Sequence, residues 1–416
     1  MTGLAGLLAE PRLQRLLAVL DGDGEETRVV GGAVRNALID APVEDVDLAT
    51  TAHPDEVTRR AKAAGFRPAP TGYDHGTITV VVERKPFEVT TLRADVETFG
   101  RHAKVEYGRD FSADARRRDF TINSMSLSRD GRVHDPLGGQ ADLAARRVRF
   151  IGDARARIEE DYLRILRFFR FHAAYGEGPL DAEGLSAVIA ERAGLRRLSA
   201  ERVRAEMLKL LGARRAGDVV REAAETGVLE ILLGAVARPL RLERLIAQDG
   251  APDAVLRLGA LCVCVREDAD RLRERLRLSN LEHRRLRAAI EIVEAMRSER
   301  QPPQGARLGA LVLAHGAGAV ADALRLGMAE NRPEQAPAWR AALAALDHYA
   351  GLKLPVSGED FKKRGLTEGR AIGAALKYLQ AQWIRAGFPR EPGEIARLID
   401  EAARQAARSA NGEDET

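Results

Sequence analysis

The chain has few cysteines and tryptophans and no long apolar run. The small number of cysteines and the lack of a long apolar run each exclude a class of protein. Two cysteines and two tryptophans occur among 416 residues. The two cysteines, Cys262 and Cys264, share one apolar run and lack the additional ligands of a metal site, so we expect core roles for them in a reducing cytoplasm. No run is long enough to span a membrane, and Glu10 and Arg12 stand where a signal peptide would be apolar, so we expect no membrane partner.

An excess of one charge is also lacking. Lys and Arg number 65 and Asp and Glu number 62, which leaves a net charge of +3. This balance permits a nucleic-acid partner without requiring one. The hydrophobic fraction of 45% can fill ordinary cores, and the length predicts two to four domains.

The most informative stretch is residues 29–50, whose pattern predicts a strand, a glycine turn, a short helix and a second strand. Gly31 and Gly32 let the backbone turn sharply and approach a ligand closely. Residues 33–39 suit a helix whose first N–H groups point back at the turn. This arrangement predicts an anion site that suits a phosphate chain.

Two carboxylates follow on the second predicted strand. Asp45 and Asp47 are two residues apart, so their side chains share one face of a strand. Two like charges so close need a cation between them, or one of the carboxylates must be protonated. Oxygen-only ligands beside a phosphate site favour Mg²⁺. Taken singly, a Gly-Gly pair is often only a turn and an Asp-x-Asp only a solvated loop. Their combination within one short unit favours a functional site.

The rest of the chain predicts an α+β N-terminal head with a small mixed sheet, followed by an all-α remainder. Leucines at helical spacing predict one opening helix over residues 3–20, and Pro54 begins a second helix, over 54–64. Strands are expected at 77–82, 87–92 and 148–151, and a long loop at 93–118. After about residue 153 the pattern is helical almost to the end.

Glu88 alternates with apolar neighbours on a predicted strand. It is either a third acidic residue of the site, acting as ligand or base, or an ordinary surface glutamate. His75 stands before a glycine in a turn, and we expect a structural role for it.

A triple arginine at 116–118 runs directly into Asp119. Such a run is usually a solvated basic face. Arginine also grips phosphates through two N–H groups, and Asp119 can accept a hydrogen bond from a ribose hydroxyl. Arg118 and Asp119 are therefore candidate nucleotide ligands.

The segment 159–171 predicts a helix that carries Glu160, Asp161 and Arg164. The ordinary interpretation is a set of helix salt bridges at spacings of three and four residues. Beside a nucleotide site, Asp161 would accept from the exocyclic amine of cytosine or adenine while Arg164 donates to the ring nitrogen. Uracil and guanine present the reverse pattern and would leave polar groups unpaired, at a cost of roughly 1–3 kcal/mol each.

Taken in order, these motifs resemble those of bacterial class II tRNA nucleotidyltransferases, the CCA-adding enzymes of the poly(A) polymerase/tRNA nucleotidyltransferase family. The resemblance covers roughly residues 28–210 and rests on the following stretches: 31–35, 45–47, 75–77, 117–121, 160–164 and 201–206.

The resemblance implies four parts: a nucleotidyltransferase head at 1–150, a helical neck at 151–215, a helical body at 216–300 and a tRNA-binding tail at 301–416. It implies template-independent addition of C, C and A to a tRNA 3′ end from CTP and ATP, with release of pyrophosphate. Asp45 and Asp47 would hold the catalytic Mg²⁺ ions, and Glu88 would join them as a catalytic residue. The expected nucleotide-binding set is Gly31, Gly32, Arg35, Arg118, Asp119, Asn123, Glu160, Asp161, Arg164 and Arg167.

Within this set, Arg35 is expected to neutralise the leaving pyrophosphate. Outside it, the segment 201–206 is expected to support the helix that reads the base. The loop around 93–115 would let specificity move from C to A. Arginine-rich helices at 271–277 and 283–287 and the stretch 361–364 would contact tRNA, although such runs are most often solvated faces.

One residue departs from the family pattern: Asn36 stands where the family has an aspartate. Four alternatives stay open. A poly(A) polymerase of the same family would add A alone, and a CC-only enzyme would stop early. The hypothesis that the chain is a non-catalytic RNA-binding protein is supported only by Asn36. A small-molecule nucleotidyltransferase of the aminoglycoside type shares the head but would not need the helical body.

Overall fold

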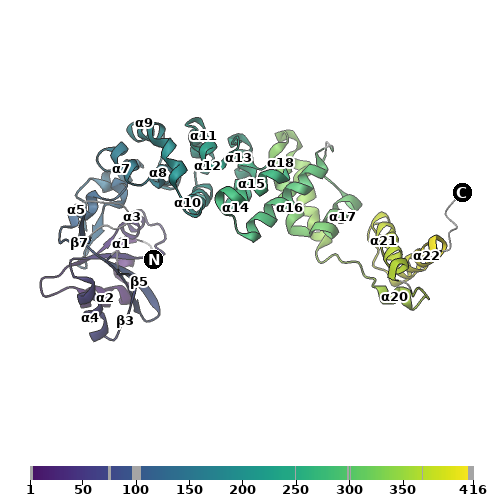
Figure 1. Ribbon diagram of the computed structural model, residues 1–416, viewed down its shortest axis with the longest axis horizontal. Helices are drawn as coiled ribbons and strands as arrows, with labels where there is room; N and C mark the ends of the chain where they lie inside the picture. The colour runs from purple at the N-terminus through teal and green to yellow at the C-terminus, as the bar shows by residue number, and fades with distance from the viewer. Residues whose placement is uncertain are drawn as a thin grey trace. The chain divides into compact units, whose positions relative to one another are not determined.

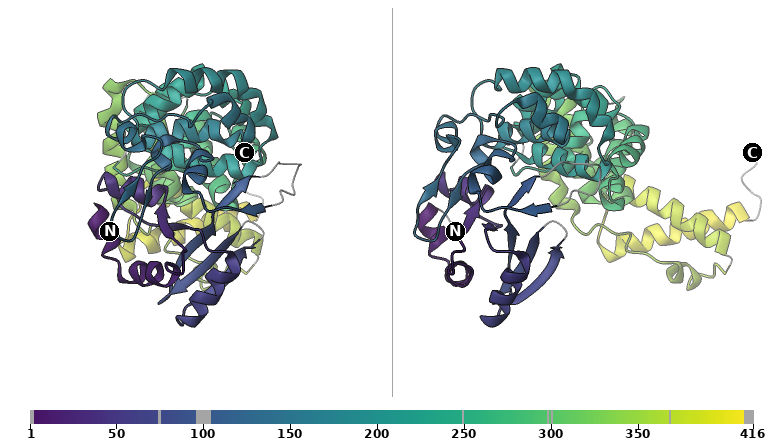
Figure 2. Two further views of the ribbon diagram at one scale, coloured as in Figure 1. Left: turned by 90° about the vertical axis from the view of Figure 1, so that its left-hand side faces the viewer. Right: turned by 60° about the vertical axis from the view of Figure 1, so that its left-hand side comes forward.

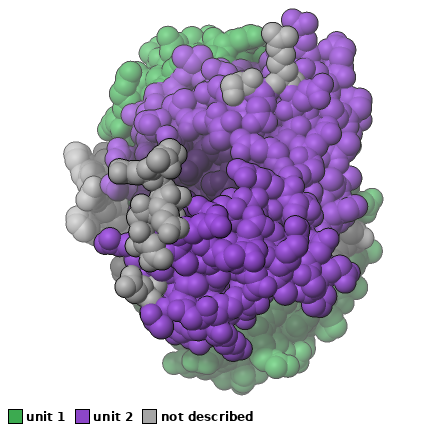
Figure 3. All heavy atoms as spheres, turned by 90° about the vertical axis from the view of Figure 1, so that its right-hand side faces the viewer, with its two compact units in different colours: residues 1–231 green, residues 232–416 purple. Residues whose placement is uncertain are grey.

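The computed structural model describes residues 3–73, 76–95, 105–248, 250–297, 299, 301–367 and 369–410. The chain divides into two compact units, residues 1–231 and residues 232–416, which are distinguished by colour in Figure 3. His75 and residues 96–104 of the predicted loop lie outside the described residues.

The first unit contains a mixed sheet of seven strands in the order β3-β4-β5-β2-β1-β8-β9. Its strands are β1 Thr27–Val30, β2 Asp47–Thr50, β3 Arg67–Gly72, β4 Thr77–Val82, β5 Lys85–Thr91, β8 Ser126–Leu127 and β9 Val133–His134. Only β2 and β5 pair in parallel; the other neighbours are antiparallel. A separate two-stranded ribbon joins β6 Arg93–Asp95 to β7 Val105–Tyr107.

Side-chain alternation gives this sheet one buried and one open face. Val29, Leu48 and Val89 are direct register partners and are almost completely buried. Helices α2 Pro11–Leu20 and α4 Pro54–Ala63 pack on the sheet, and both appear beside it in Figure 1. Because successive residues of a strand point to opposite faces, Asp47 and Glu88 share the other face.

The remaining helices of the first unit are mostly short. They are α1 Gly3–Leu8, α3 Gly32–Leu38, α5 Phe111–Arg116, α6 Gly139–Ala144, α7 Ala154–Glu160, α8 Leu163–Tyr175, α9 Ala182–Glu191, α10 Ala200–Gly212 and α11 Ala216–Glu225, with 3-10 turns at Thr121–Asn123 and Arg192–Arg197. The boundary between the two units falls within α12 Val228–Leu233. Helix α8 carries the aromatic residues that join the helices to the sheet region: Phe120 packs on Phe150, Phe168 and Phe171.

The second unit is helical throughout its described part. Its helices are α13 Pro239–Ile246, α14 Ala254–Cys262, α15 Arg266–Leu276, α16 Asn280–Met296, α17 Gly305–His315, α18 Ala317–Glu330, α19 Ala336–Ala345, α20 Gly358–Lys362, α21 Gly369–Arg385 and α22 Pro392–Ala410, with 3-10 turns at Pro333–Gln335 and Leu346–Tyr349. Figure 2 shows α21 and α22 side by side, where Trp383 and Phe388 centre a local core. No helix in the described ranges combines the length and apolar character needed to span a bilayer.

The expected α+β head followed by an all-α remainder is confirmed, and so is the burial of Cys262. Cys264 is also a free thiol, but it is partly exposed, so the predicted core position is confirmed only in part for this residue. The strand expected at 77–82 and the helix beginning at Pro54 are found where predicted.

The single opening helix predicted over residues 3–20 is wrong. The chain forms α1 and α2 with a break at Glu10, because Pro11 has no N–H to continue the first helix and instead begins the second. The Glu10 side chain caps α2 by accepting from the backbone N–H of Arg12.

The strand predicted at 148–151 is also wrong. Two backbone hydrogen bonds join this segment to its neighbour: Thr121 N donates to Arg149 O, and Ile151 N donates to Asp119 O. They make only an isolated bridge between Phe120 and Phe150. The strands β3, β8 and β9 were missed because they are short or contain proline, and α5, β6 and β7 occupy parts of the predicted loop.

Candidate functional site

The predicted glycine turn connects β1 to α3 and requires glycine at its first position. Gly31 has φ 66° and ψ −121°, a conformation that an L side chain rarely adopts. A Cβ built on Gly31 would lie 2.7 Å from Nη1 of Arg118. A Cβ built on Gly32 would lie 3.6 Å from Nη2 of Arg35, which is an ordinary van der Waals contact. The turn therefore brings the backbone against two guanidinium groups that the sequence predicted to bind nucleotide.

The predicted acidic cluster is partly assembled. Asp47 begins β2 and lies directly opposite Glu88 of β5 in the parallel register. Asp45 precedes the strand, so the prediction that both carboxylates stand on one strand is wrong for Asp45. Both aspartates remain exposed at this edge.

The electrostatics of Asp47 reflect these neighbours. Partial removal of the Asp47 carboxyl from water raises its pKa, and the charges of Glu88 and Asp45 add to that effect while Arg118 opposes it. In the described ranges no three His, Cys, Asp or Glu side chains are close enough to hold a metal ion on their own. The crowding of carboxylates nevertheless suits a divalent cation, because a positive charge would relieve their repulsion and ligand oxygens would complete its coordination.

The Arg35 side chain is buried by its neighbours. It is 6% exposed, and its guanidinium lies 3.9 Å from the centre of the Tyr175 ring. It donates from Nε and Nη2 to Oδ1 of Asn36, at 3.1 and 2.9 Å, from Nη2 to the Tyr175 hydroxyl at 2.7 Å, and from Nη1 to Asn123 Oδ1 at 2.5 Å. Burial lowers the Arg35 pKa to about 10.

Asn36 is the amide that replaces the family aspartate, and both of its polar atoms are used. Its Oδ1 accepts from Arg35 and from the Tyr175 hydroxyl, the latter at 3.2 Å. Its Nδ2 donates to the backbone oxygen of Pro42 at 2.9 Å, a bond that a carboxylate could not make. The residue therefore orients Arg35 and the loop that leads to Asp45.

A buried polar network continues from Arg35 toward the helices that follow the sheet. Asn123 donates from Nδ2 to Oδ1 of Asp119 at 2.9 Å, and Arg167 donates from Nε to Oδ2 of Asp119 at 2.7 Å. The side chain of Glu206 on α10 lies 3.8 Å from Arg167 and accepts from Nε of Arg170 at 2.6 Å. Asp119 is only 7% exposed, so both of its oxygens are held by protein donors.

Arg118 is oriented by a carboxylate that the sequence analysis missed. Its Nε and Nη2 donate to Oδ2 of Asp114 at 3.1 and 3.0 Å. Burial opposes ionisation of Asp114, but the charges of Arg118 and Arg117 lower its pKa overall. The spacing of four residues between Asp114, on α5, and Arg118, just after the end of α5, would have indicated this pair. No comparable signal pointed to Tyr175, which is 140 residues from Arg35.

The single helix predicted over 159–171 is interrupted. Helix α7 ends at Glu160, and Asp161 takes an extended conformation with φ −155° and ψ 103° before α8 begins at Leu163. Glu160 pairs with Arg164 as the spacing predicted. Asp161 instead accepts from Nη2 of Arg202 at 2.7 Å and from the backbone N–H of Leu163 at 3.2 Å.

The break changes what the base-reading residues can do. Outside a regular helix, the Asp161 carboxylate is directed by Arg202 on α10 rather than by Arg164. Arg164 extends toward the sheet region, where Nη2 donates to the backbone oxygen of Arg117 at 3.4 Å. Arg164 thus lies next to the arginine that abuts the glycine turn.

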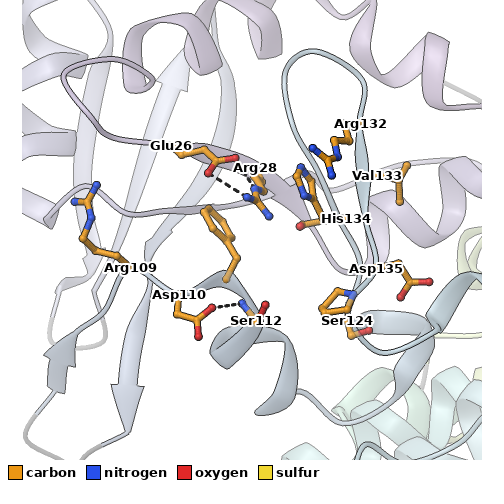
Figure 4. A pocket seen from close by; sticks show the side chains of 13 residues that line it. Glu26, Arg28, Arg109, Asp110, Ser112, Ser124, Arg132, Val133, His134 and Asp135 are labelled. Atoms are coloured by element: carbon orange, nitrogen blue, oxygen red, sulfur yellow. Dashed lines mark hydrogen bonds and ion pairs between the residues drawn. The ribbon is translucent and has the colours of Figure 1, made fainter.

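The first unit also contains a cavity of about 490 Å³. None of the predicted site residues lines it. Figure 4 shows that its walls bring together Arg28, bonded to Glu26, with Arg132, His134 and Ser124. Phe111 lines the cavity under the Arg28 guanidinium, 3.9 Å away, and also packs on Val30. Burial and the charges of Arg28 and Arg132 lower the pKa of His134, which favours its neutral imidazole.

Comparison with known proteins identifies close relatives of the chain. Residues 27–149 match the family model of the poly A polymerase head domain, and residues 180–238 match that of a probable RNA and SrmB-binding site of polymerase A. The mitochondrial CCA tRNA nucleotidyltransferase 1 of Mus musculus is 34% identical over 409 residues, covering 93% of this chain and 89% of the relative. A CCA-adding enzyme of Geobacillus thermodenitrificans is 38% identical over 243 residues, or 57% of this chain and 59% of the relative.

Solved structures share the fold along almost the whole chain. A CCA-adding enzyme of Bacillus stearothermophilus, determined in complex with CTP, superposes with a TM-score of 0.70 at 25% identity and covers 96% of this chain and 98% of that one. The Thermotoga maritima CCA-adding enzyme, complexed with tRNA, gives a TM-score of 0.70 at 21% identity with the same coverage.

Proposed function

The chain belongs to the family of CCA-adding tRNA nucleotidyltransferases, and from this premise we propose that it adds C, C and A to the 3′ end of tRNA. CTP and ATP are the substrates and pyrophosphate is released. The observation that carries this proposal is one of geometry: Asp47 faces Glu88, the Arg118 guanidinium lies against the glycine turn, and Arg164 donates to the backbone oxygen of the neighbouring Arg117. Asp161 precedes Arg164 in the break between α7 and α8. Full-length similarity to the mouse enzyme supports the same activity.

Asp45 and Asp47 are the residues that we propose to hold Mg²⁺, with Glu88 beside them. The ion, when bound, supplies charge that favours ionisation of the RNA 3′-hydroxyl and offsets charge on the phosphates. The chain's own residues hold the α-phosphorus in line with that hydroxyl. A new bond from the 3′-oxygen to the α-phosphorus then forms as the bond to the bridging oxygen of pyrophosphate breaks.

The glycine turn and Arg118 are proposed to bind the triphosphate and ribose. Arg35 and Asp119 have a different role in this proposal from the one expected from sequence. Their polar groups are bonded within the protein, so we assign them to positioning: Arg35 fixes the turn, and Asp119 joins Asn123 to Arg167.

Glu160, Asp161 and Arg164 are proposed to select the base. The amine of cytosine or adenine would approach the Asp161 carboxylate, while Arg164 donates to the ring nitrogen. Because Arg202 occupies one oxygen of Asp161, the incoming base shares that carboxylate with Arg202 or displaces it. This competition makes Arg202 part of base selection.

The four functional parts stay a proposal: head 1–150, neck 151–215, body 216–300 and tail 301–416, the last with tRNA contacts. We also propose that the enzyme works in the cytoplasm, where its two free thiols remain reduced.

The test supplies a tRNA transcript that lacks its 3′ CCA, together with Mg²⁺ and CTP, ATP, both, or UTP and GTP, followed by sequencing of the 3′ ends. The expected product carries C, C and A and then stops. A long A tail from ATP alone would move the assignment to a poly(A) polymerase, and C, C without A to a CC-only enzyme. Tight tRNA binding without extension would favour a non-catalytic RNA-binding protein.

A further inference from the structure

The second unit contains a cavity to which the predicted RNA-contact stretches 271–277, 283–287 and 361–364 contribute no lining residue. Its volume is about 710 Å³, and it lies between α13, the segment joining α14 to α15, and the ends of α16 and α18. Four arginines line it, Arg238, Arg241, Arg244 and Arg297, with Glu330 as the one carboxylate among its lining residues. We call this cavity the arginine pocket.

The charges in the arginine pocket are poorly balanced. Arg241 is 5% exposed; its Nη2 lies 3.1 Å from Oε1 of Glu330, and its Nη1 donates to the backbone oxygen of Val263 at 2.6 Å. Arg244 and Arg297 donate to backbone oxygens, which carry no formal charge to offset the guanidinium groups. The side chain of Arg238 is exposed and, in the part of the chain that the structure describes, makes no hydrogen bond or ion pair.

Burial of Arg241 costs free energy, and the pocket compensates it only in part. Removal from water and the charge of Arg238 lower the Arg241 pKa, while Glu330 opposes them. Four guanidinium groups facing one carboxylate leave an excess positive charge that an anion would neutralise. Guanidinium groups bind phosphate oxygens through paired, charge-assisted hydrogen bonds.

An apolar surface adjoins these charges. Leu240 lines the pocket and is 60% exposed, and Val236, on the segment leading into α13, is 79% exposed. Large apolar side chains with that much exposure are few in the described residues, and two of them, Val236 and Leu240, are four positions apart in the chain. Positive charge beside an apolar platform matches a nucleotide unit, which has an anionic phosphate and a base with an apolar face.

We propose that the arginine pocket binds a backbone phosphate of the tRNA, with the adjoining nucleoside against Leu240. This inference rests on the proposed function, because it takes tRNA as the ligand. It adds a binding site to the basic stretches at 271–277, 283–287 and 361–364 that the sequence indicated. Arg238 and Arg244 would bind the phosphate. Arg241 and Glu330, which pair with each other, form the wall of the pocket.

The first experiment measures KM for tRNA in the double variant Arg238→Gln/Arg244→Gln. We expect KM to rise about three- to tenfold, with kcat at saturating tRNA and KM for CTP unchanged, because one phosphate contact is weakened while every residue proposed for catalysis and nucleotide binding is kept. The dependence of log KM on log salt should become shallower by about 1. The matched control, Arg15→Gln/Arg59→Gln, removes two exposed arginines from the first unit, each of which is paired with a glutamate. Equal effects in both variants, or none in either, would overturn the proposal.

The second experiment uses the unaltered protein and its two thiols. Cys264 lines the arginine pocket and is partly exposed, whereas Cys262 is buried, and burial raises its pKa to about 12. We expect N-ethylmaleimide to modify Cys264 but not Cys262, and tRNA to slow that modification at least fivefold. Cys262 serves as an internal control for unfolding.

Parallel arms of the alkylation separate the sources of phosphate. CTP, ATP and inorganic phosphate at the same phosphate concentration should protect Cys264 less than tRNA does. Protection by free nucleotide equal to that by tRNA would contradict an RNA site, as would undiminished alkylation under saturating tRNA. If tRNA protects Cys264 but no CCA is added, the proposed function fails and the binding site stands.

Discussion

Arg167 donates a hydrogen bond from Nε to Oδ2 of Asp119 at 2.7 Å, which ties α8 to the segment that follows α5. Asp119 also holds Asn123, and Asn123 holds Arg35 beside the glycine turn. A short chain of polar contacts therefore connects the phosphate-binding turn to the helix that carries Arg164. Substitution of any member is expected to disturb both ends.

Replacing Arg167 with Met should lower the free energy of unfolding by about 2–3 kcal/mol, because it leaves the buried Asp119 carboxylate without its charged donor. Urea unfolding of the purified variant measures this loss. The double variant Arg167→Met/Asp119→Asn should recover part of it, since the uncompensated charge is then gone. Additive losses in the double variant would show that the two residues do not act as a pair.

Replacing Asp47 with Asn should abolish nucleotide addition and yet stabilise the protein when no divalent cation is present. The folded state raises the Asp47 pKa, so the ionised carboxylate disfavours folding as pH rises above its ordinary titration range. An amide removes this penalty at neutral pH. Thermal unfolding with EDTA should therefore give a higher Tm for the variant.

Addition of Mg²⁺ is expected to reverse that order. The ion binds the wild-type carboxylates and raises the wild-type Tm, while the variant responds less. Glu88→Gln provides the comparison for a neighbouring carboxylate. Equal Mg²⁺ responses in wild type and Asp47→Asn would contradict Asp47 as a metal ligand.

Replacing Asn36 with Asp should leave activity within about threefold of wild type. The carboxylate would strengthen the contact with Arg35 but would lose the hydrogen bond to the Pro42 backbone oxygen, and the two changes are each of order 1 kcal/mol. Steady-state kinetics with CTP and ATP check the outcome. A gain of a hundredfold or more would show that the amide limits this enzyme, as the non-catalytic alternative requires.

Replacing Asp161 with Ala should lower kcat/KM for both CTP and ATP by about a hundredfold, because a hydrogen bond from the base amine to a carboxylate is lost. Discrimination against UTP should weaken at the same time. Arg202→Ala is the informative companion: it frees the same carboxylate and should lower KM for CTP if Arg202 competes with the base. Sequencing of 3′ ends after incubation with each nucleotide measures these ratios.

The lowered pKa of Glu10 predicts that part of the loss of stability in acid is independent of the catalytic site. Its hydrogen bond with Arg12, together with the contact with Lys85, lowers the Glu10 pKa from 4.5 to about 2. A carboxyl with a depressed pKa stabilises the folded state above pH 4.5 and loses that contribution as pH falls toward 2. Stability of Glu10→Gln, followed by urea unfolding from pH 6 to 2.5, should therefore depend less on pH than that of wild type. Parallel curves would exclude a role for Glu10.

The sequence by itself determined the elements whose signals are local. Alternating apolar residues defined β4 and β5, proline began α4, and the Gly-Gly pair marked a turn that only glycine can make. The order of motifs also indicated the family, because spacing along the chain needs no tertiary contact to be recognised. Charge spacing along the chain found the pair Glu160–Arg164, which forms although the two residues stand on either side of the break between α7 and α8.

The tertiary structure decided which partner each polar group received. Asp161 pairs with Arg202, which is 41 residues away, and Arg35 with Tyr175 and Asn123, because folding brings separate helices together and a buried donor must find an acceptor there. The opposition of Asp47 to Glu88 follows from strand order, and the arginine pocket from the packing of four helical segments. Local pattern specifies the conformation of a segment, whereas burial and pairing depend on residues that are distant in sequence.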